Sequence, residues 1–103
     1  MSAQQLSTNA LHQGHDVTAT QGTRSVPIFQ STAYVFNDSD HAAKLFSLAE
    51  PGFIYTRLNN PTVDVLEQRI AAMEGGLAAV ATASGTSALS TAVLVVLKHG
   101  DHI

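Results

Sequence analysis

Residues 77–97 constrain the fold of this chain more than any other segment. Leu77–Ala83 is apolar or small on both faces, which is typical of a strand covered on both sides. From Ser84–Ser87 to Leu97 the composition predicts a helix that is apolar on nearly every side and therefore buried. Such a strand and helix need a sheet and a covering layer that the remaining residues cannot supply. We therefore expect the front part of a larger α/β protein: a fragment, a truncated gene model or one piece of a cleaved polypeptide.

Composition excludes several classes of function. The net charge is −3 and the five Lys and Arg residues form no cluster, which argues against nucleic-acid binding. The chain has no cysteine, so a disulfide framework and a thiolate zinc site are excluded. His12 and His15 are three residues apart but lack a third ligand, so no metal site is expected. Met1–Asn9 has no signal-peptide character, and the longest apolar run, Ala92–Leu97, is too short to cross a bilayer. We expect a soluble, cytoplasmic protein without a membrane partner.

Two helices are predicted in the first half of the chain, separated by extended segments. Apolar residues near the N-terminus support a short helix, and residues 13–36 favour an extended arm. Asp38, Ser39 or Asp40 can cap a second helix that runs to about Ala49, before Pro51. Its expected apolar face comprises Ala42, Leu45, Phe46 and Ala49.

A third helix is predicted over residues 61–74. Asn60 suits the N-cap and Pro61 the first helical position, while Gly75 suits a left-handed C-terminal residue. The stripe expected to be buried comprises Val63, Leu66, Ile70 and Met73.

Tyr55 and Arg57 form the first candidate binding site. Phe53–Leu58 is predicted to be extended, so side chains two residues apart point the same way. A phenol and a guanidinium on one face, directly before a helix start, are suited to binding a phosphate. The alternative is that the pair simply forms a half-exposed strand face.

The turn Ser84-Gly85-Thr86-Ser87 forms the second candidate site. It joins the expected strand to the start of the expected helix, where the first N–H groups have no partner and the helix dipole is positive. One phosphate group would fit there. The alternative is an ordinary N-cap serine followed by a turn glycine.

Several short motifs follow one another in a characteristic order: Val26–Phe36, Tyr55-Thr56-Arg57, Asn60-Pro61-Thr62, Leu66-Glu67, Glu74-Gly75-Gly76, Ser84-Gly85 and Gly100-Asp101. This order resembles that of a known family, the pyridoxal-phosphate enzymes of cysteine and methionine metabolism. The resemblance extends over about residues 20–103, and residues 41–46 with 52–57 are most similar to the O-acetylhomoserine sulfhydrylase branch of the family.

The resemblance implies fold type I of the pyridoxal-phosphate enzymes, with residues 1–59 as an arm contacting the neighbouring subunit. Residues 60–103 would begin the α/β domain that binds pyridoxal 5′-phosphate. It further implies that Tyr55 and Arg57 bind the phosphate of the cofactor held by the partner. Gly85 and Thr86 would offer backbone amides to the phosphate in their own subunit.

The implied activity is that of a transferase making homocysteine from O-acetylhomoserine and sulfide. Cystathionine γ-synthase and methionine or cystathionine γ-lyase are the alternatives within the family. The family's Schiff-base lysine matches neither Lys44 nor Lys98, so no catalytic residue is expected in this chain, which would be inactive alone. The resemblance also implies a homo-oligomer, a dimer sharing its active sites and assembled as a tetramer. The alternative of another class is a non-catalytic fragment acting only in dimerisation and cofactor contact.

Overall fold

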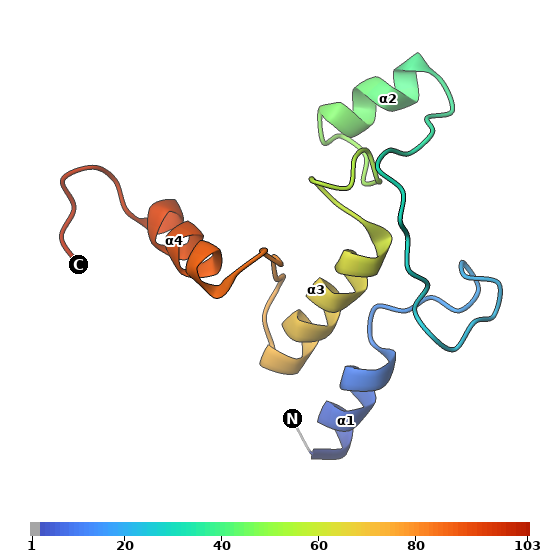
Figure 1. Cartoon of the computed structure of the whole chain (residues 1–103), viewed down its shortest axis with the longest axis horizontal. Helices are drawn as coiled ribbons and strands as arrows, with labels where there is room; N and C mark the ends of the chain where they lie inside the picture. The colour runs from blue at the N-terminus through green and yellow to red at the C-terminus, as the bar shows by residue number, and fades with distance from the viewer. Residues whose placement is uncertain (1–2) are drawn as a thin grey trace.

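The computed structural model describes residues 3–103, and these form four helices without a sheet: α1 (Ala3–His12), α2 (Ser39–Phe46), α3 (Pro61–Glu74) and α4 (Gly85–Val96) (Figure 1). The only β-type pairing among the described residues is an isolated antiparallel bridge between Ala33 and Tyr55. No helix in this part of the chain is long and apolar enough to cross a membrane.

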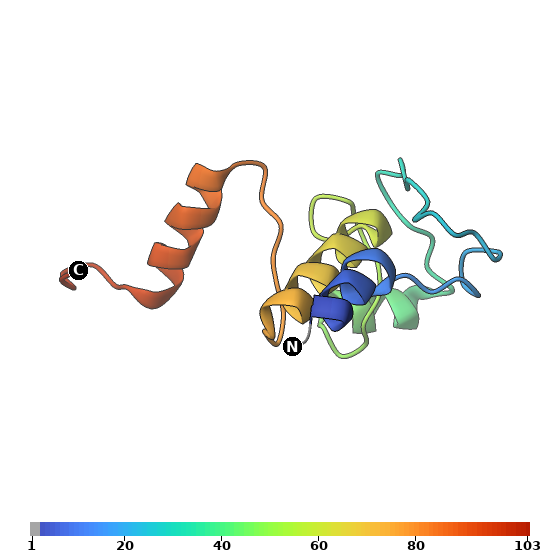
Figure 2. The same cartoon turned by 90° about the horizontal axis from the view of Figure 1, so that it is seen from below.

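Helices α1 and α3 lie side by side and form the main helix–helix contact (Figures 1 and 2). The chain leaves α1 through Gly14, whose φ of 76° is left-handed. A Cβ at this glycine would lie 2.9 Å from the Cβ of Gln68, so the close approach requires glycine. Nearby, Arg69 Nε donates a hydrogen bond to the carbonyl of Gln13 at 2.9 Å. Helix α1 and the residues just after it thus pack against α3.

Helix α3 has the bounds and caps that its sequence predicts. Asn60 is the N-cap, Pro61 is the first residue, and Gly75 ends the helix with a left-handed φ of 68°. The prediction for its buried face is wrong for this chain. Val63, Leu66 and Ile70 are exposed and Met73 is half-buried, because no other segment covers most of the apolar stripe. The fully buried residue of α3 is Ala71.

Helix α2 begins as predicted, with Asp38 accepting a hydrogen bond from the His41 amide, but it ends at Phe46. The expectation of a helix to Ala49 is wrong by three residues. Leu48 takes a left-handed φ of 59°, and its amide and that of Ala49 bond back to Leu45 and Lys44. This hydrogen-bond pattern is a Schellman motif, which terminates helices. Leu45, only 3% exposed, packs beneath Gly52.

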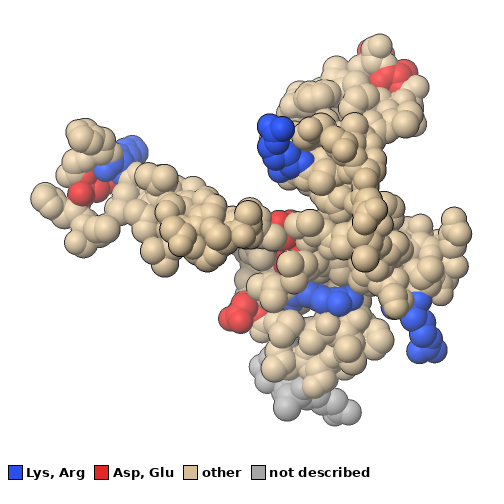
Figure 3. All heavy atoms as spheres, in the orientation of Figure 1, with Lys and Arg blue, Asp and Glu red and all other residues tan. Residues whose placement is uncertain are grey.

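The predicted strand 77–83 is wrong, and the predicted burial of the following helix is not observed. Residues 77–83 are irregular, without a β-partner among the described residues. Helix α4 extends away from the other helices with no buried residue, and Figure 3 shows an uncharged surface along it. The physical reason is that a strand forms only by pairing with other strands, and an apolar helix is buried only when a layer covers it.

Candidate functional site

Two extended segments of the arm pair and carry Tyr55. The amide of Tyr34 donates to the carbonyl of Ile54 at 3.3 Å, and the amide of Thr56 donates to the carbonyl of Thr32 at 2.9 Å. The Thr56 hydroxyl also donates to the Ser31 carbonyl. Tyr55 is therefore held in a short antiparallel pairing between segments about twenty residues apart in the chain.

The start of α3 anchors both segments through side chains. The amide nitrogen of Asn60 donates to the Phe29 carbonyl at 2.9 Å, and the Thr62 hydroxyl donates to the Pro27 carbonyl at 2.8 Å. Asn59 binds the other segment, donating to the Gly52 carbonyl at 2.7 Å and accepting from the Ile54 amide at 3.2 Å. We call Asn59, Asn60 and Thr62 the clamp. The sequence identified Asn60 only as a helix cap, since the Phe29 carbonyl that its NH₂ group binds lies 31 residues earlier.

Tyr55 and Arg57 lie together as predicted, but the predicted extended backbone that was to bring them together is wrong. Residues 55–58 form a turn and not an extended strand, because the Tyr55 carbonyl accepts from the amides of Leu58 at 2.8 Å and Asn59 at 3.1 Å. Arg57 Cζ nevertheless lies 5.4 Å from the centroid of the Tyr55 ring, a cation–π contact. Within residues 3–103 Arg57 forms no ion pair, and its guanidinium is exposed.

Cavities open on both sides of this pair. One, of about 390 Å³, is lined by Tyr55, Thr56 and Arg57 together with residues 29–32. The other, of about 460 Å³, is more apolar and also has Tyr55 and Arg57 in its wall. Its remaining lining residues are Ala33, Tyr34, Phe36, Phe46, Ile54 and Leu58. A phenol and an unpaired cation thus face space large enough for a small anionic ligand.

The second predicted site is the start of α4. Ser84 is its N-cap, and its hydroxyl accepts from the Ser87 amide at 3.1 Å. Among the described residues the amides of Gly85 and Thr86 have no hydrogen-bond acceptor. A Cβ placed on Gly85 would meet nothing within 4 Å, so a ligand can approach the backbone closely. The two free amides lie at the positive end of the helix dipole.

The single chain does not bring the two predicted sites together. Gly85 lines neither of the two cavities that have Arg57 in their walls. Figure 1 shows α4 directed away from the loop that precedes α3. The two candidate sites therefore lie apart within this chain, and we call them the Tyr55–Arg57 half-site and the Gly85–Thr86 half-site.

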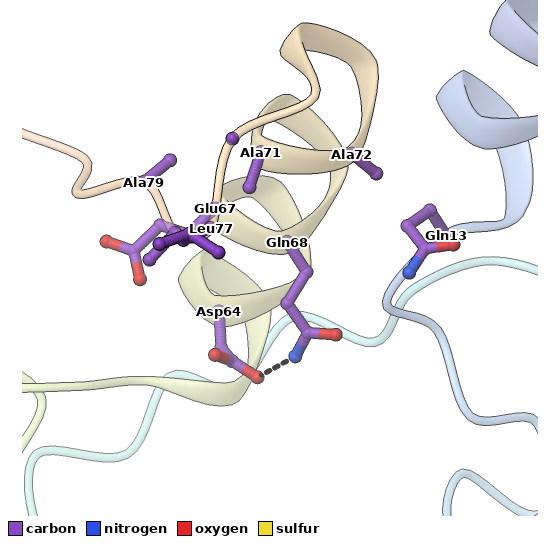
Figure 4. Close-up of a pocket in the computed structure, with 10 residues that line it drawn as sticks. Gln13, Asp64, Glu67, Gln68, Ala71, Ala72, Leu77 and Ala79 are labelled. Carbon is purple, nitrogen blue, oxygen red and sulfur yellow. Dashed lines mark hydrogen bonds between the residues drawn. The ribbon is translucent and has the colours of Figure 1, made fainter. Parts of the chain in front are cut away.

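A third cavity, of about 430 Å³, lies beside α3 (Figure 4). Gln68 donates to the Asp64 carboxylate at 2.7 Å, and Glu67 accepts from the Ala81 amide at 2.7 Å. Glu67 is thus a polar anchor for residues 77–83. Both carboxylates of this cavity accept hydrogen bonds within the chain, and no cation faces them there.

The comparisons with known proteins identify the family. The family described as Cys/Met metabolism PLP-dependent enzyme matches residues 7–103. The chain belongs to this family. Among curated relatives, the O-acetyl-L-homoserine sulfhydrylase of Leptospira meyeri is 57% identical over 93% of this chain, and the homocysteine synthase of Schizosaccharomyces pombe is 55% identical over 90%. The chain spans only 22% of the length of each of these relatives.

Solved structures confirm the predicted fold class, as the N-terminal part of fold type I. A Campylobacter jejuni protein described as an O-acetylhomoserine (thiol)-lyase superposes with a TM-score of 0.82 at 48% identity, covering 86% of this chain and 22% of that one. The metB protein of Corynebacterium glutamicum gives 0.81 at 35% identity, covering 97% and 24%. The Campylobacter structure contains pyridoxyl-lysine phosphate, and pyridoxal phosphate is the cofactor of the family.

The residues of both half-sites fit the phosphate of this cofactor. An exposed guanidinium without an ion pair beside a phenol provides charge-assisted donors, and two free amides at a helix start provide neutral ones.

Proposed function

We propose that this chain is the N-terminal part of a pyridoxal-phosphate-dependent transferase that makes homocysteine and acetate from O-acetylhomoserine and sulfide. The observation that carries the proposal is the Tyr55–Arg57 pair, a cation stacked on a phenol at 5.4 Å without an ion pair in the described chain. Relatives named for this activity match at 57% and 53% identity, which supports the substrate class. The proposed location is the cytoplasm.

In the proposed site each cofactor phosphate is bound from two subunits. Tyr55 and Arg57 donate to the phosphate held by the neighbouring subunit, and the Gly85 and Thr86 amides donate to the phosphate in their own. Residues 1–59 would form the arm that reaches the partner, and residues 60–103 would begin the cofactor domain. The assembly would be a dimer of shared active sites, further paired as a tetramer. The separation of the half-sites within one chain supports this arrangement.

The chemistry is divided between this chain and the rest of the protein. When bound, the cofactor delocalises the electron pair left behind when the substrate loses its Cα proton. The role of Tyr55, Arg57, Gly85 and Thr86 is to hold the phosphate so that the cofactor is oriented toward the substrate amine. None of these residues moves a proton of the substrate, so the proposal assigns no catalytic residue to this chain.

Other activities of the family are alternatives, because an L-methionine gamma-lyase of Fusobacterium nucleatum is 47% identical over 95% of this chain. The complete protein should be assayed with O-acetylhomoserine plus sulfide, with cysteine in place of sulfide, and with methionine alone. Homocysteine formation supports the proposal. Cystathionine formation would instead assign a cystathionine γ-synthase, and release of methanethiol a γ-lyase.

A non-catalytic piece is the alternative of a different class, because none of the four candidate site residues is catalytic. Under either proposal the purified 103-residue chain should bind no cofactor covalently, whereas the complete protein should show the visible absorption of a lysine-linked cofactor. If the chain occurs in cells without the rest of the protein, the transferase proposal fails.

The Arg57→Ala substitution tests the proposed phosphate site in the complete protein. A charge-assisted hydrogen bond contributes roughly 1.5–3 kcal/mol, so cofactor affinity should fall by about tenfold to a hundredfold. Equilibrium titration of the apoprotein with pyridoxal phosphate measures the change. Arg24→Ala is the matched control, because Arg24 is an exposed arginine of the arm that lines neither cavity. Unchanged affinity of the Arg57 variant would remove that residue from the site.

A further inference from the structure

Asn60 is the one polar side chain buried among those that the structure describes, at 5% exposure. Its carbonyl oxygen accepts from the Thr62 amide at 2.9 Å, the ordinary contact of a helix N-cap. Its amide nitrogen lies 2.9 Å from the Phe29 carbonyl and 3.2 Å from both the Tyr34 and Thr56 hydroxyl oxygens. Two N–H groups therefore serve three acceptors.

Capping alone does not explain why an amide stands at this position. Asp and Ser cap helices about as well as Asn, yet neither of them offers an NH₂ group. An aspartate here would place a carboxylate against the Phe29 carbonyl, where an N–H now donates. The NH₂ group of Asn60 thus has a structural role separate from capping α3.

The acceptors of this NH₂ group lead directly to the phosphate-binding pair. Thr56 stands between Tyr55 and Arg57 in the chain, and its hydroxyl and amide are bound to the facing segment at Ser31 and Thr32. Tyr34 lines the same cavity as Tyr55 and Arg57, with its ring 5.6 Å from that of Phe53. Asn60 therefore contacts the centre of the turn that carries the pair and one wall of its cavity.

We propose that Asn60 is a positioning residue for the phosphate-binding pair, acting through its NH₂ group and Thr56 to fix the direction of Tyr55 and Arg57. The inference rests on the proposed function, since it assumes that the pair binds phosphate. Asn60 does not contact the cofactor. It fixes the backbone of the turn, so the guanidinium and phenol reach the phosphate without first being ordered.

The test uses Asn60→Asp in the complete apoprotein, since Asp keeps the cap and loses the two donors. Affinities for pyridoxal 5′-phosphate and for pyridoxal, which lacks the phosphate, are measured side by side. We expect affinity for the phosphorylated form to fall about tenfold, as for loss of part of a charge-assisted contact, with little change for pyridoxal. Equal losses for both ligands, or no loss for either, would overturn the proposal.

A matched control separates positioning from general destabilisation. Gly75→Ala strains the backbone at the other end of α3, because Gly75 has a left-handed φ of 68°. The added Cβ would meet no other atom within 4 Å, so the substitution introduces no steric clash. It should lower the melting temperature and leave the ratio of the two affinities unchanged. If Gly75→Ala changes that ratio as Asn60→Asp does, the effect is one of stability and the proposal fails.

The two single variants together distinguish failure of this inference from failure of the proposed site. If Arg57→Ala alone leaves phosphate affinity unchanged, the proposed site is wrong and the inference falls with it. If Arg57→Ala weakens binding and Asn60→Asp does not, only the inference is wrong. When both single variants weaken binding, adding Asn60→Asp to Arg57→Ala should reduce phosphate affinity much less than Asn60→Asp does alone. The effects of substitutions at residues that act together are not additive.

If the Asn60→Asp variant does not fold, Thr56→Val takes its place. Its affinities for pyridoxal 5′-phosphate and pyridoxal are compared in the same way, with the same deciding outcomes.

Discussion

At the scale of single residues, two glycines with nearly equal backbone angles have different surroundings. Gly14 and Gly22 have φ angles of 76° and 77°. A Cβ on Gly14 would meet Gln68 Cβ at 2.9 Å and the Val65 carbonyl at 3.2 Å, whereas nothing lies within 4 Å of Gly22. The pair therefore allows backbone strain and steric contact to be measured separately.

We predict that Gly14→Ala destabilises the protein more than Gly22→Ala. Both variants bear the left-handed cost of about 1–2 kcal/mol, and Gly14→Ala adds about 1–3 kcal/mol for the clash with α3. Thermal unfolding of the two variants measures the difference. Equal melting temperatures would mean that α1 and α3 do not pack as described.

Asp16 gives the arm a dependence on pH. Hydrogen bonds from the Thr18 hydroxyl at 2.6 Å and amide at 2.8 Å, and a longer one from the Ala19 amide, hold the pKa of this carboxyl below its usual range. Because the folded-state pKa is lowered, the carboxylate's contribution is complete above its unfolded pKa of about 4 and is lost as the pH falls through the folded value.

We therefore predict that residues 16–20 lose order below about pH 4, the range set by an ordinary aspartate pKa. Amide chemical shifts of Thr18 and Ala19 followed by NMR should report the transition. In the Asp16→Asn variant an acceptor oxygen remains but the ionisable group is gone, so the titration should disappear. A transition that persists in this variant would belong to another group.

At the scale of elements, the N-cap residues determine where the helices begin. Asp38 accepts from the His41 amide at 2.7 Å and begins α2, a helix of only eight residues. Short helices depend strongly on their ends, because few internal hydrogen bonds offset the unsatisfied groups there.

Asp38→Ala should destabilise α2 by about 1 kcal/mol, the typical cost of losing an N-cap. Hydrogen exchange of residues 39–46 measures this locally. Asp40→Ala is the matched control, since Asp40 lies in the first turn and caps nothing. It removes only a favourable charge near the helix dipole, worth about 0.3–1 kcal/mol. Faster exchange in the control than in Asp38→Ala would contradict the assignment of the cap.

These same elements show which structural features could be predicted from the sequence. The start of α3 at Pro61 and its end at Gly75 were predictable because Asn60, Pro61 and Gly75 act within a few residues of each helix end. The turn after Tyr55 is closed by local hydrogen bonds, but it was not predictable because residues 56–58 include none of the residue types that most favour turns. The second role of Asn60 was not predictable because its acceptor, the Phe29 carbonyl, lies 31 residues earlier in the chain. Strand 77–83 was wrongly predicted because its composition reflects neighbours that this chain does not contain.

For the whole molecule, the apolar surface is the dominant feature. Exposed large side chains extend over the stripe of α3 and the whole of α4, including Ile70, Leu89 and Leu94. Exposed apolar surface on this scale normally contacts another protein surface. In the proposed complete protein the rest of the cofactor domain would cover it.

We predict that the isolated chain binds the hydrophobic dye ANS and self-associates as its concentration rises. Light scattering after size-exclusion chromatography measures the association. Leu94→Lys should reduce both effects in the isolated chain and destabilise the complete protein, where α4 is expected to be buried. A strictly monomeric, dye-silent chain would show that α4 folds back onto the molecule.

The clamp has a consequence for biosynthesis. Its bonds to Pro27, Phe29 and Gly52 all reach backward along the chain from residues 59–62. The loop bearing Tyr55 and Arg57 can therefore take shape once Thr62 has left the ribosome, before α4 has emerged from it.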